Sequence, residues 1–386
     1  MRKIPTISTL AITAAVGCSM PAFAVDTETA AHQQEEETQS SAIPDAIARF
    51  VPTADPIRHR IDYGIWDWAL KNIVVSMGRS LRKTAKQPDP VMGTRIRQGH
   101  NSRYRLEGSV VGFVFLEENV KRSFTEYRED LQSVADTLDI SSLPRNEQLA
   151  YWLNLHNVAM VEQIAKAWPL RQPRELMIDG VPLDQAKIVT VNGIALSPND
   201  IRTKIVYPNW KDPRVIYGFW RGEIGGPALD RHAYNGKNVG SLLNIAADDF
   251  INSLRGSQKL GKTMQVSTLY DEVAPFYFPD FEVDLRAHIA EYADEDTQEI
   301  LDKTTALESS IREYDIADLS GGKLQANYLF AQSGNSTSRI PQGMWMYLKA
   351  RDDKLRYMNR KDIPTGTVIF SNIDLPGDPP NKNAVE

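Results

Sequence analysis

The chain of 386 residues contains one cysteine, Cys18, and it lies close to the start. The chain opens with basic residues, an apolar run from Ile4 to Met20, and the segment Pro21-Ala22-Phe23-Ala24. This order is typical of a secretory signal peptide (residues 1–24) that is cut after Ala24. The mature chain is then expected to hold no cysteine, which excludes disulfides, a thiol nucleophile and thiolate metal ligands.

Export leaves two locations open. The first is the periplasm or the medium, as a soluble protein. The second is lipid anchoring through Cys18, because Ala15-Val16-Gly17-Cys18 resembles a lipoprotein signal. The apolar run is short and is interrupted by Thr6, Ser8 and Thr13, so we expect no transmembrane segment after signal removal.

Positive charge is also in short supply. The chain has 44 Lys and Arg residues and 50 Asp and Glu residues, which gives a net charge of −6. Removal of Arg2 and Lys3 with the signal peptide would change the net charge to −8. This balance excludes a generally cationic nucleic-acid binder. The sequence also lacks a His-Glu-x-x-His helix, a Gly-x-Ser-x-Gly elbow, a phosphate-binding loop and a calcium loop. We therefore expect no nucleic-acid partner, no metal and no cofactor.

Composition divides the remainder into four segments. Residues 25–45 are acidic and free of aromatic side chains, and they are predicted to be a disordered spacer. Residues 46–115 contain apolar and aromatic residues and are predicted to be mainly helical. Residues 116–320 are predicted to be one domain. The signals weaken after Gly321-Gly322, so residues 321–386 are a C-terminal extension with a flexible tail from Leu375.

Local patterns within residues 116–320 predict an α+β fold. Apolar residues at helical spacing, Ser-Pro at a helix start, Asp-Gly and Asn-Gly turns, and a run of β-forming residues each predict one element. The predicted elements are a helix from Phe124 to Leu138, hairpins at Asp179-Gly180 and Asn192-Gly193, a helix starting at Ser197, a strand from Arg214 to Trp220, and helices Asn238–Leu254 and Glu282–Thr305.

The segment from Gln148 to Val161 is the most informative one. It is apolar on nearly every side, yet it carries Asn154, His156 and Asn157. Burying an amide or imidazole without a partner costs about 1–3 kcal/mol, so a hydrogen-bond network is expected. The two asparagines are expected to hold loop backbone, and His156 is expected to be a core histidine rather than a catalytic one.

This segment resembles the "A-F-W-I-N-L-Y-N-A" helix of the bacterial and plant family called domain of unknown function 547. Further pieces follow the family's order along roughly Val120–Leu319, about half of the chain. They are Phe124–Leu131, Leu196–Ile201, Pro213–Phe219, Arg231–Tyr234, Tyr270–Phe281 and Tyr314–Ser320. The resemblance implies a papain- or transglutaminase-like fold, in which helices pack on a mostly antiparallel sheet.

The departures from the family pattern concern its chemistry. Gly226 stands where the family has the second cysteine of "C-G-A-x-S-C-P", and Arg202-Thr203 stand where it has Glu-His. A thiolate nucleophile needs a thiol and a nearby base. The resemblance therefore implies a degenerate member that cannot perform thiol chemistry.

Glu223 and His232 form the one acid/base pair of the degenerate loop, and with His156 they are the remaining catalytic candidates. Both loop residues are more often solvated than catalytic. Trp220 and Tyr234 are expected to line what remains of the cleft around Gly226.

Two functions are left open. The preferred prediction is an exported, soluble, non-catalytic protein that binds a small ligand or an envelope protein. The alternative is a hydrolase or acyl-transfer enzyme with a rearranged acid/base site. A cleft that contains a polarised acid/base pair would favour the enzyme.

Overall fold

The computed structural model describes residues 47–51, 60–87, 100–325, 328–333, 336–364 and 385. The chain divides into two compact units, Met1–Ala46 and Ile47–Glu386, and every described residue belongs to the second unit. The predicted signal peptide with Cys18 and the predicted spacer lie outside the described residues. So does the predicted tail from Leu375, apart from Val385.

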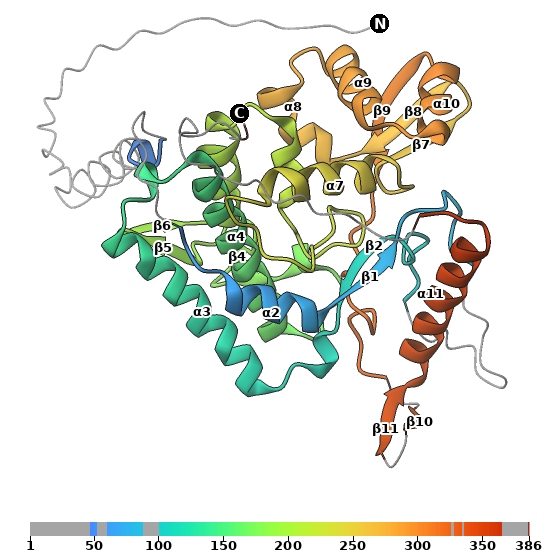
Figure 1. Cartoon of the computed structure of the whole chain (residues 1–386), viewed down its shortest axis with the longest axis horizontal. Helices are drawn as coiled ribbons and strands as arrows, with labels where there is room; N and C mark the ends of the chain where they lie inside the picture. Colours follow the sequence, from blue (N-terminus) through green and yellow to red (C-terminus); the bar gives the residue numbers. More distant parts are fainter. Residues whose placement is uncertain are drawn as a thin grey trace, which may run out of the picture. The chain divides into compact units, whose positions relative to one another are not determined.

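Helices predominate among the described elements (Figure 1). The α-helices are α2 (Gly64–Ile73), α3 (Glu118–Thr137), α4 (Arg145–Ala167), α5 (Pro198–Asp200), α6 (Tyr207–Asn209), α7 (Val239–Ile251), α8 (Leu269–Tyr277), α9 (Phe281–Tyr292), α10 (Glu295–Lys303) and α11 (Gln342–Arg360). The short helices are η1 (Phe113–Phe115), η2 (Ile140–Ser142), η3 (Pro173–Glu175), η4 (Ile201–Val206) and η5 (Pro213–Gly218).

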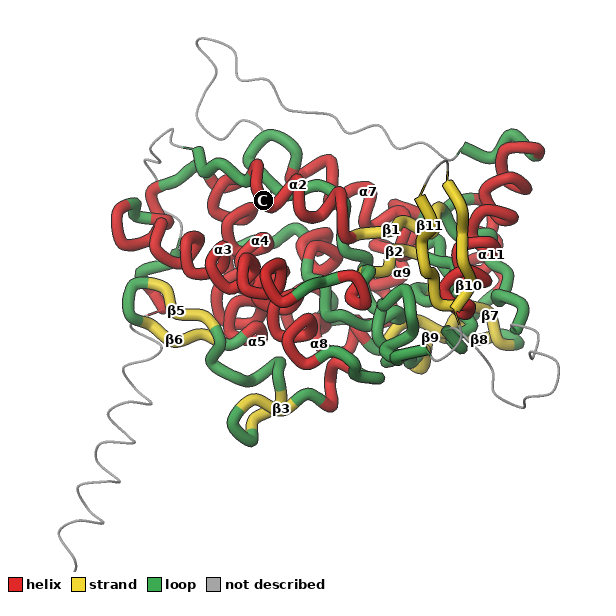
Figure 2. Tube along the Cα trace, turned by 90° about the horizontal axis from the view of Figure 1, so that it is seen from below, coloured by secondary structure: helices red, strands yellow, loops and turns green. Residues whose placement is uncertain are grey.

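The strands are short and form several small sheets. Four antiparallel pairs are β1–β2, β3–β4, β5–β6 and β10–β11, and a three-stranded sheet has the order β7–β8–β9, with β8 and β9 parallel. Most of them lie around the margin of the helices (Figure 2). The strands are β1 (Val74–Gly78), β2 (Gly108–Val111), β3 (Met177–Ile178), β4 (Val181–Pro182), β5 (Val189–Val191), β6 (Ile194–Leu196), β7 (Ser257–Leu260), β8 (Thr263–Ser267), β9 (Ala306–Ile311), β10 (Tyr328–Ser333) and β11 (Ser336–Pro341).

This mixture of helices and small sheets confirms the predicted α+β class. The core is organised around α4, which contacts α3, α5, η4 and α7. Every residue from Asn146 to Glu162 is buried, as expected for a helix that is apolar on nearly all sides. The papain- or transglutaminase-like fold stays a prediction.

Both predicted hairpins are confirmed. Asp179 and Gly180 have φ of 50° and 82°, and Asn192 and Gly193 have φ of 51° and 76°. Two successive residues with positive φ form the tight turn whose twist matches that of paired strands, and Asp-Gly and Asn-Gly favour this turn. Each hairpin is antiparallel.

The helix starts are also confirmed where the caps predict them. The Ser197 hydroxyl accepts from the backbone N–H of Asp200, and the Asp200 carboxylate accepts from the backbone N–H of Ser197. This reciprocal capping box satisfies two N–H groups that a helix start leaves without partners. Helices α3 and α7 lie where the helical spacing predicts them.

The strand predicted from Arg214 to Trp220 is wrong. Residues Pro213–Gly218 form the 3₁₀ helix η5, in which Pro213 occupies the first turn and the Asp212 carboxylate accepts from the N–H of Arg214. Val215, Ile216 and Tyr217 are completely buried. The run of β-branched and aromatic side chains therefore indicates burial in the core. Such side chains pack in the core in a strand and in a 3₁₀ helix alike.

The single helix predicted from Glu282 to Thr305 is also wrong, because two helices occupy this segment. Helix α9 ends at Tyr292, and Asp294 caps α10 by accepting from the N–H of Thr297. A capping carboxylate offers the backbone an alternative to a continuous helix. The acidic composition concealed this boundary.

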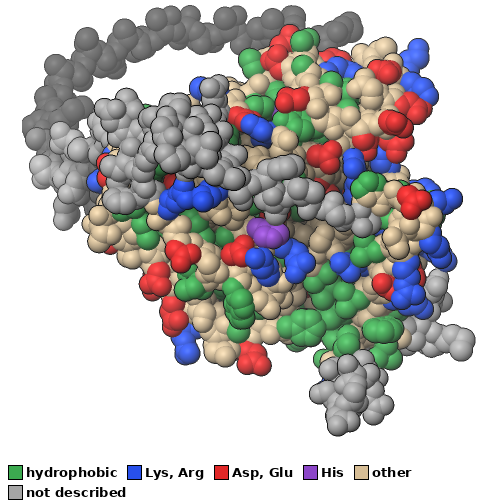
Figure 3. Space-filling view, in the orientation of Figure 1, with side chains coloured by type: hydrophobic (Ala, Val, Ile, Leu, Met, Phe, Trp, Pro, Cys, Tyr) green, Lys and Arg blue, Asp and Glu red, His purple; other side chains and the backbone are tan. Residues whose placement is uncertain are grey.

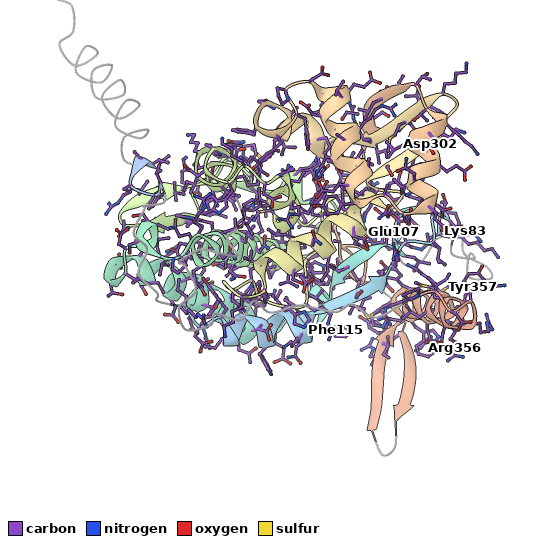
Figure 4. The ribbon with its side chains drawn as sticks, turned by 45° about the horizontal axis from the view of Figure 1, so that its top comes forward. Lys83, Glu107, Phe115, Asp302, Arg356 and Tyr357 are labelled. Atoms are coloured by element: carbon purple, nitrogen blue, oxygen red, sulfur yellow. The ribbon has the colours of Figure 1, made fainter. Side chains whose placement is uncertain are left out.

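The segments on either side of residues 116–320 contain elements that the sequence did not predict. Residues 46–115 include α2 but also the paired strands β1 and β2. Side chains of helix α11 donate to backbone carbonyls of β1 and of the segment before β2. Arg351 donates to Ser76, and Lys354 donates to Met77, Gly78 and Leu106. Figure 4 shows Lys83 beside Tyr357 of α11, with the ammonium 5.7 Å from the ring centre.

Candidate functional site

Asn154 and Asn157 hold two loops against α4. Asn154 Nδ2 donates to the Tyr234 carbonyl at 2.7 Å, and Asn154 Oδ1 accepts from the Tyr234 N–H at 3.1 Å. Asn157 Nδ2 donates to the Gly218 carbonyl at 2.9 Å, and its Oδ1 accepts from the Trp220 N–H at 3.0 Å. Each side-chain amide thus donates one hydrogen bond to loop backbone and accepts one from it, as a paired strand would. These bonds hold each loop at a fixed position on α4.

His156 is completely buried, and both of its ring nitrogens are used. Nε2 lies 3.0 Å from Nη1 of Arg202, and Nδ1 lies 3.0 Å from Oδ1 of Asn157. A guanidinium can only donate, so Nε2 accepts and Nδ1 carries the proton. Burial, together with the charge of Arg202, lowers the pKa of His156 to about 3. The imidazole is therefore neutral at pH 7.

Arg202 belongs to an irregular turn within a longer helix. Residues Pro198–Asn209 are helical throughout, but Ile201–Val206 form a π-helical segment in which the Tyr207 N–H bonds to the Arg202 carbonyl. Such wide turns cost stability and are frequent at functional sites. Arg202 and Thr203, the two positions for which the resemblance implies Glu-His, both lie in this turn.

Four charged residues surround this turn, and we call Asp184, Arg202, Arg221 and Glu272 the ion-pair cluster. Arg202 binds Asp184 through two hydrogen bonds of 2.8 Å and donates from Nε to Glu272 at 3.2 Å. Arg221 binds Glu272 through bonds of 2.6 and 2.7 Å. Two cations and two carboxylates cancel, so the cluster has no net charge.

The cluster extends from the core to the surface. The Arg202 side chain has no exposed area, whereas those of Asp184, Glu272 and Arg221 are 39%, 28% and 19% exposed. Burial alone would raise the pKa of Asp184, but the charge and hydrogen bonds of Arg202 together with the charge of Arg221 outweigh it and lower that pKa to about 2. The pKa of Glu272 is likewise lowered, because Arg221 and Arg202 together outweigh burial. Neither carboxylate is poised to exchange a proton near neutral pH.

The structure gives Glu223 and His232 separate partners. Arg174 binds both carboxylate oxygens of Glu223, at 2.7 and 3.1 Å. His232 Nδ1 lies 3.1 Å from Oδ1 of Asp230, and this bond raises the pKa of His232. Burial raises the pKa of Glu223 against the opposing charge of Arg174. The two residues therefore do not form a contact pair.

The other predicted site residues lie in the core or away from Arg202. Trp220 and Tyr234 are 1% and 3% exposed and belong to the main hydrophobic core. The Gly226 carbonyl accepts from Nη1 of the buried Arg255 at 2.8 Å. Among the described residues, a Cβ built on Gly226 would meet only the Glu223 carbonyl within 4 Å, at 3.5 Å. The position would therefore accommodate a side chain, but it shares no contact residue with Arg202.

Asp184, Arg221 and Glu272 were not predicted as site residues. They lie in three separate segments, the turn after β4, the loop after η5 and helix α8, and no local motif joins them. The one available signal was indirect, since a basic residue at 202 in a buried helix requires carboxylate partners.

No group of three or more His, Cys, Asp or Glu side chains within the described ranges is arranged to hold a metal ion. No helix among these residues has the length and apolar character needed to cross a membrane.

Residues 140–251 match the family described as Protein of unknown function, DUF547. This segment begins at η2 and ends with α7, and it includes α4, Arg202, Arg221 and Gly226. The resemblance to this family is therefore confirmed over the segment that holds most of the site. No curated protein and no solved structure matches the chain.

Proposed function

We propose that this protein is an exported, non-catalytic member of the resembled family and that it binds a partner protein. The observation that carries the proposal is the contact between Arg202 and His156. Where the resembled family has an acidic residue, this chain has a cation that occupies Nε2 of the buried histidine. Export rests on the signal peptide that the sequence predicts.

The loss of catalysis follows from the requirements of acid/base chemistry. A general base needs a nitrogen or carboxylate that can reach substrate and a pKa near the working pH. His156 has neither, because both nitrogens are bonded and burial lowers its pKa to about 3. Asp184 and Glu272 are held as carboxylates by arginines. The residues of the ion-pair cluster thus stabilise the fold and do not transfer protons.

A partner protein is favoured over a small ligand by an exposed apolar face on α2. Trp66 and Leu70 of this helix are buried in the core, yet Ile65 and Trp68 on its other side are 70% and 69% exposed. Phe115, 58% exposed, lies near the end of α2 in Figure 4. Hydrophobic side chains gather between α2 and β11 in Figure 3. Adjacent exposed apolar side chains of this size mark interaction surfaces.

The catalytic part is tested with ester and amide substrates. We expect the purified protein to give no rate above background, and Glu223→Gln and His232→Ala to leave that result unchanged. A rate clearly above background that either substitution abolishes would overturn the proposal. It would establish the alternative, a hydrolase or acyl-transfer enzyme in which the raised pKa of Glu223 makes it the acid.

The binding part is tested by placing a photo-crosslinking amino acid at position 68. We expect one specific adduct from envelope extracts and none when the same amino acid replaces Val283, which is 62% exposed on α9. Equal labelling at the two positions would show that the α2 face has no partner of its own.

A further inference from the structure

Val385 is buried although it lies far from the elements that the sequence predicts. Its side chain is 3% exposed and belongs to the main hydrophobic core. Its backbone N–H donates to Oδ1 of Asn146 at 2.7 Å. A valine that is both buried and hydrogen-bonded through its backbone occupies a defined position.

The first turn of α4 and the first turn of α7 form the position in which Val385 lies. Asn146 is the second residue of α4, and Gly240 is the second residue of α7. Asn146 also donates from Nδ2 to the Gly236 carbonyl at 3.3 Å, and this bond aims its Oδ1 at Val385. The loop before α7 is fixed in turn, because the Gly236 N–H donates to the Glu147 carboxylate.

Gly240 shows how closely Val385 fits. A Cβ built on Gly240 would lie 3.7 Å from Cγ2 of Val385 and would meet no other described atom within 4 Å. Val385 is therefore what covers the start of α7 among the described residues. A methyl group at position 240 would only touch Val385, whereas a longer side chain that extends in the same direction would overlap it.

We propose that the first turns of α4 and α7 form a peptide socket, defined by Asn146 and Gly240, and that Val385 of the same chain occupies it. The socket recognises a short branched aliphatic side chain together with the backbone N–H of that residue. Side-chain pockets combined with backbone hydrogen bonds are a common mode of peptide recognition. Both socket residues lie within residues 140–251, so Val385 contacts the segment that matches the family.

The first experiment measures hydrogen exchange of the Val385 amide by NMR in full-length protein labelled with [¹⁵N]valine. The Val385 resonance is assigned by its loss in Val385→Ile. We expect exchange about 10 to 100 times slower than in an unfolded peptide, the factor that burying one valine supplies. Gly240→Leu should remove this protection, because its side chain fills the space of Val385. Gly240→Ala is the matched control and should retain it.

We expect Gly240→Leu to leave the rest of the fold intact, because a Cβ at position 240 meets only Val385 among the described atoms and leucine favours a helix more than glycine does. The amides of Val158 and Val161 in α4 report on this within the same spectra. Protection of Val385 that persists in Gly240→Leu, or that is absent from the wild-type protein, would overturn the proposal.

The second experiment separates the occupant from the socket. A variant that lacks residues 384–386 should bind a fluorescein-labelled peptide of residues 377–386 saturably. It should not bind the same peptide with aspartate in place of the valine, nor should the truncated Gly240→Leu variant bind the original peptide. Absence of binding by the truncated protein would refute the socket. A wild-type dimer that Gly240→Leu dissociates would show that the valine comes from a second copy, which would refute occupation within one chain.

Discussion

Replacing Arg202 with methionine tests the central claim about the site. Methionine preserves the length of the side chain and its contacts with the core but removes the cation. Asp184 would lose two hydrogen bonds, Glu272 one and His156 Nε2 its donor. We expect Arg202→Met to fold and to be clearly less stable than the wild-type protein.

The magnitude follows from the exposure of the partners. Removing one member of a buried ion pair costs about 3–5 kcal/mol when the other is left buried. Here Asp184 is 39% exposed, and Arg221 still neutralises Glu272, so water and Arg221 recover part of the loss. We therefore expect a loss of about 2–4 kcal/mol in the free energy of unfolding at pH 7.

The pH dependence gives a sharper test. The folded-state pKa of Asp184, about 2, lies below its ordinary value of 3.8, so its stabilisation is present above pH 4 and is lost as the pH falls towards 2. His156 has a folded pKa of about 3 against an ordinary 6.5, so protonation favours the unfolded chain between these values. Without Arg202 the pKa of His156 should rise, and the variant should lose less stability on acidification. The difference in the free energy of unfolding between the wild-type protein and Arg202→Met should therefore become smaller below pH 6.5.

Urea unfolding at pH 7 and pH 4.5 measures both quantities, and NMR of the histidine side chains locates the pKa of His156. Arg202→Lys serves as the matched control, because it preserves the charge but not the paired hydrogen bonds. It should keep the pKa of His156 low and lose less stability than the methionine variant. If Arg202→Met lowered the free energy of unfolding by less than about 0.5 kcal/mol, the stabilising role of the ion-pair cluster would be refuted, because substitutions of surface residues have effects of that size. So would a His156 pKa near 6.5 in the wild-type protein.

Three further predictions concern the loops and α11. Asn154→Leu should lower the free energy of unfolding by about 1–3 kcal/mol, because both backbone groups of Tyr234 lose their partner; an unchanged urea midpoint would contradict this. Burial lowers the pKa of Lys354 to about 8 from an ordinary 10.5, so the unfolded chain binds more protons between these values and stability should rise from pH 8 to 10. Lys354→Met should lack that rise in urea titrations. Gly222→Ala should cost more than about 2 kcal/mol by thermal unfolding, because φ is +81° and the new Cβ would lie 2.4 Å from Ile164, whereas Gly226→Ala should cost under about 1 kcal/mol.

The elements that could be predicted from the sequence depend on chemistry within a few residues. Asn192-Gly193 specifies its turn because both residues tolerate positive φ, and Ser197 and Asp200 cap each other across three residues. The burial of Asn154 could also be predicted, because an amide in an apolar helix requires partners. The partner, Tyr234, lies 80 residues further along the chain, and no motif near Asn154 identifies it.

Elsewhere the same composition supports two conformations. Val215, Ile216 and Tyr217 indicate a buried segment correctly but do not distinguish a strand from a 3₁₀ helix. The decisive contacts are tertiary, since α7 packs against η5 and no strand of the described residues pairs with it. Helix α11 was missed for a related reason, because its side chains donate to carbonyls of β1 more than 270 residues earlier in the chain.

Arg202 shows why the candidate site could be located but not understood from the sequence. The comparison with the family motif finds the position, because an arginine stands where the resemblance implies a glutamate, and the proposed absence of catalysis starts from this difference. What the arginine gains depends on Asp184, 18 residues before it, and on Glu272, 70 residues after it. A buried cation without those carboxylates would cost several kcal/mol, so the substitution at 202 is tolerable only together with them. Arg202 is thus part of a neutral ion-pair network, and the π-helical turn that carries it to His156 is the local irregularity of the site.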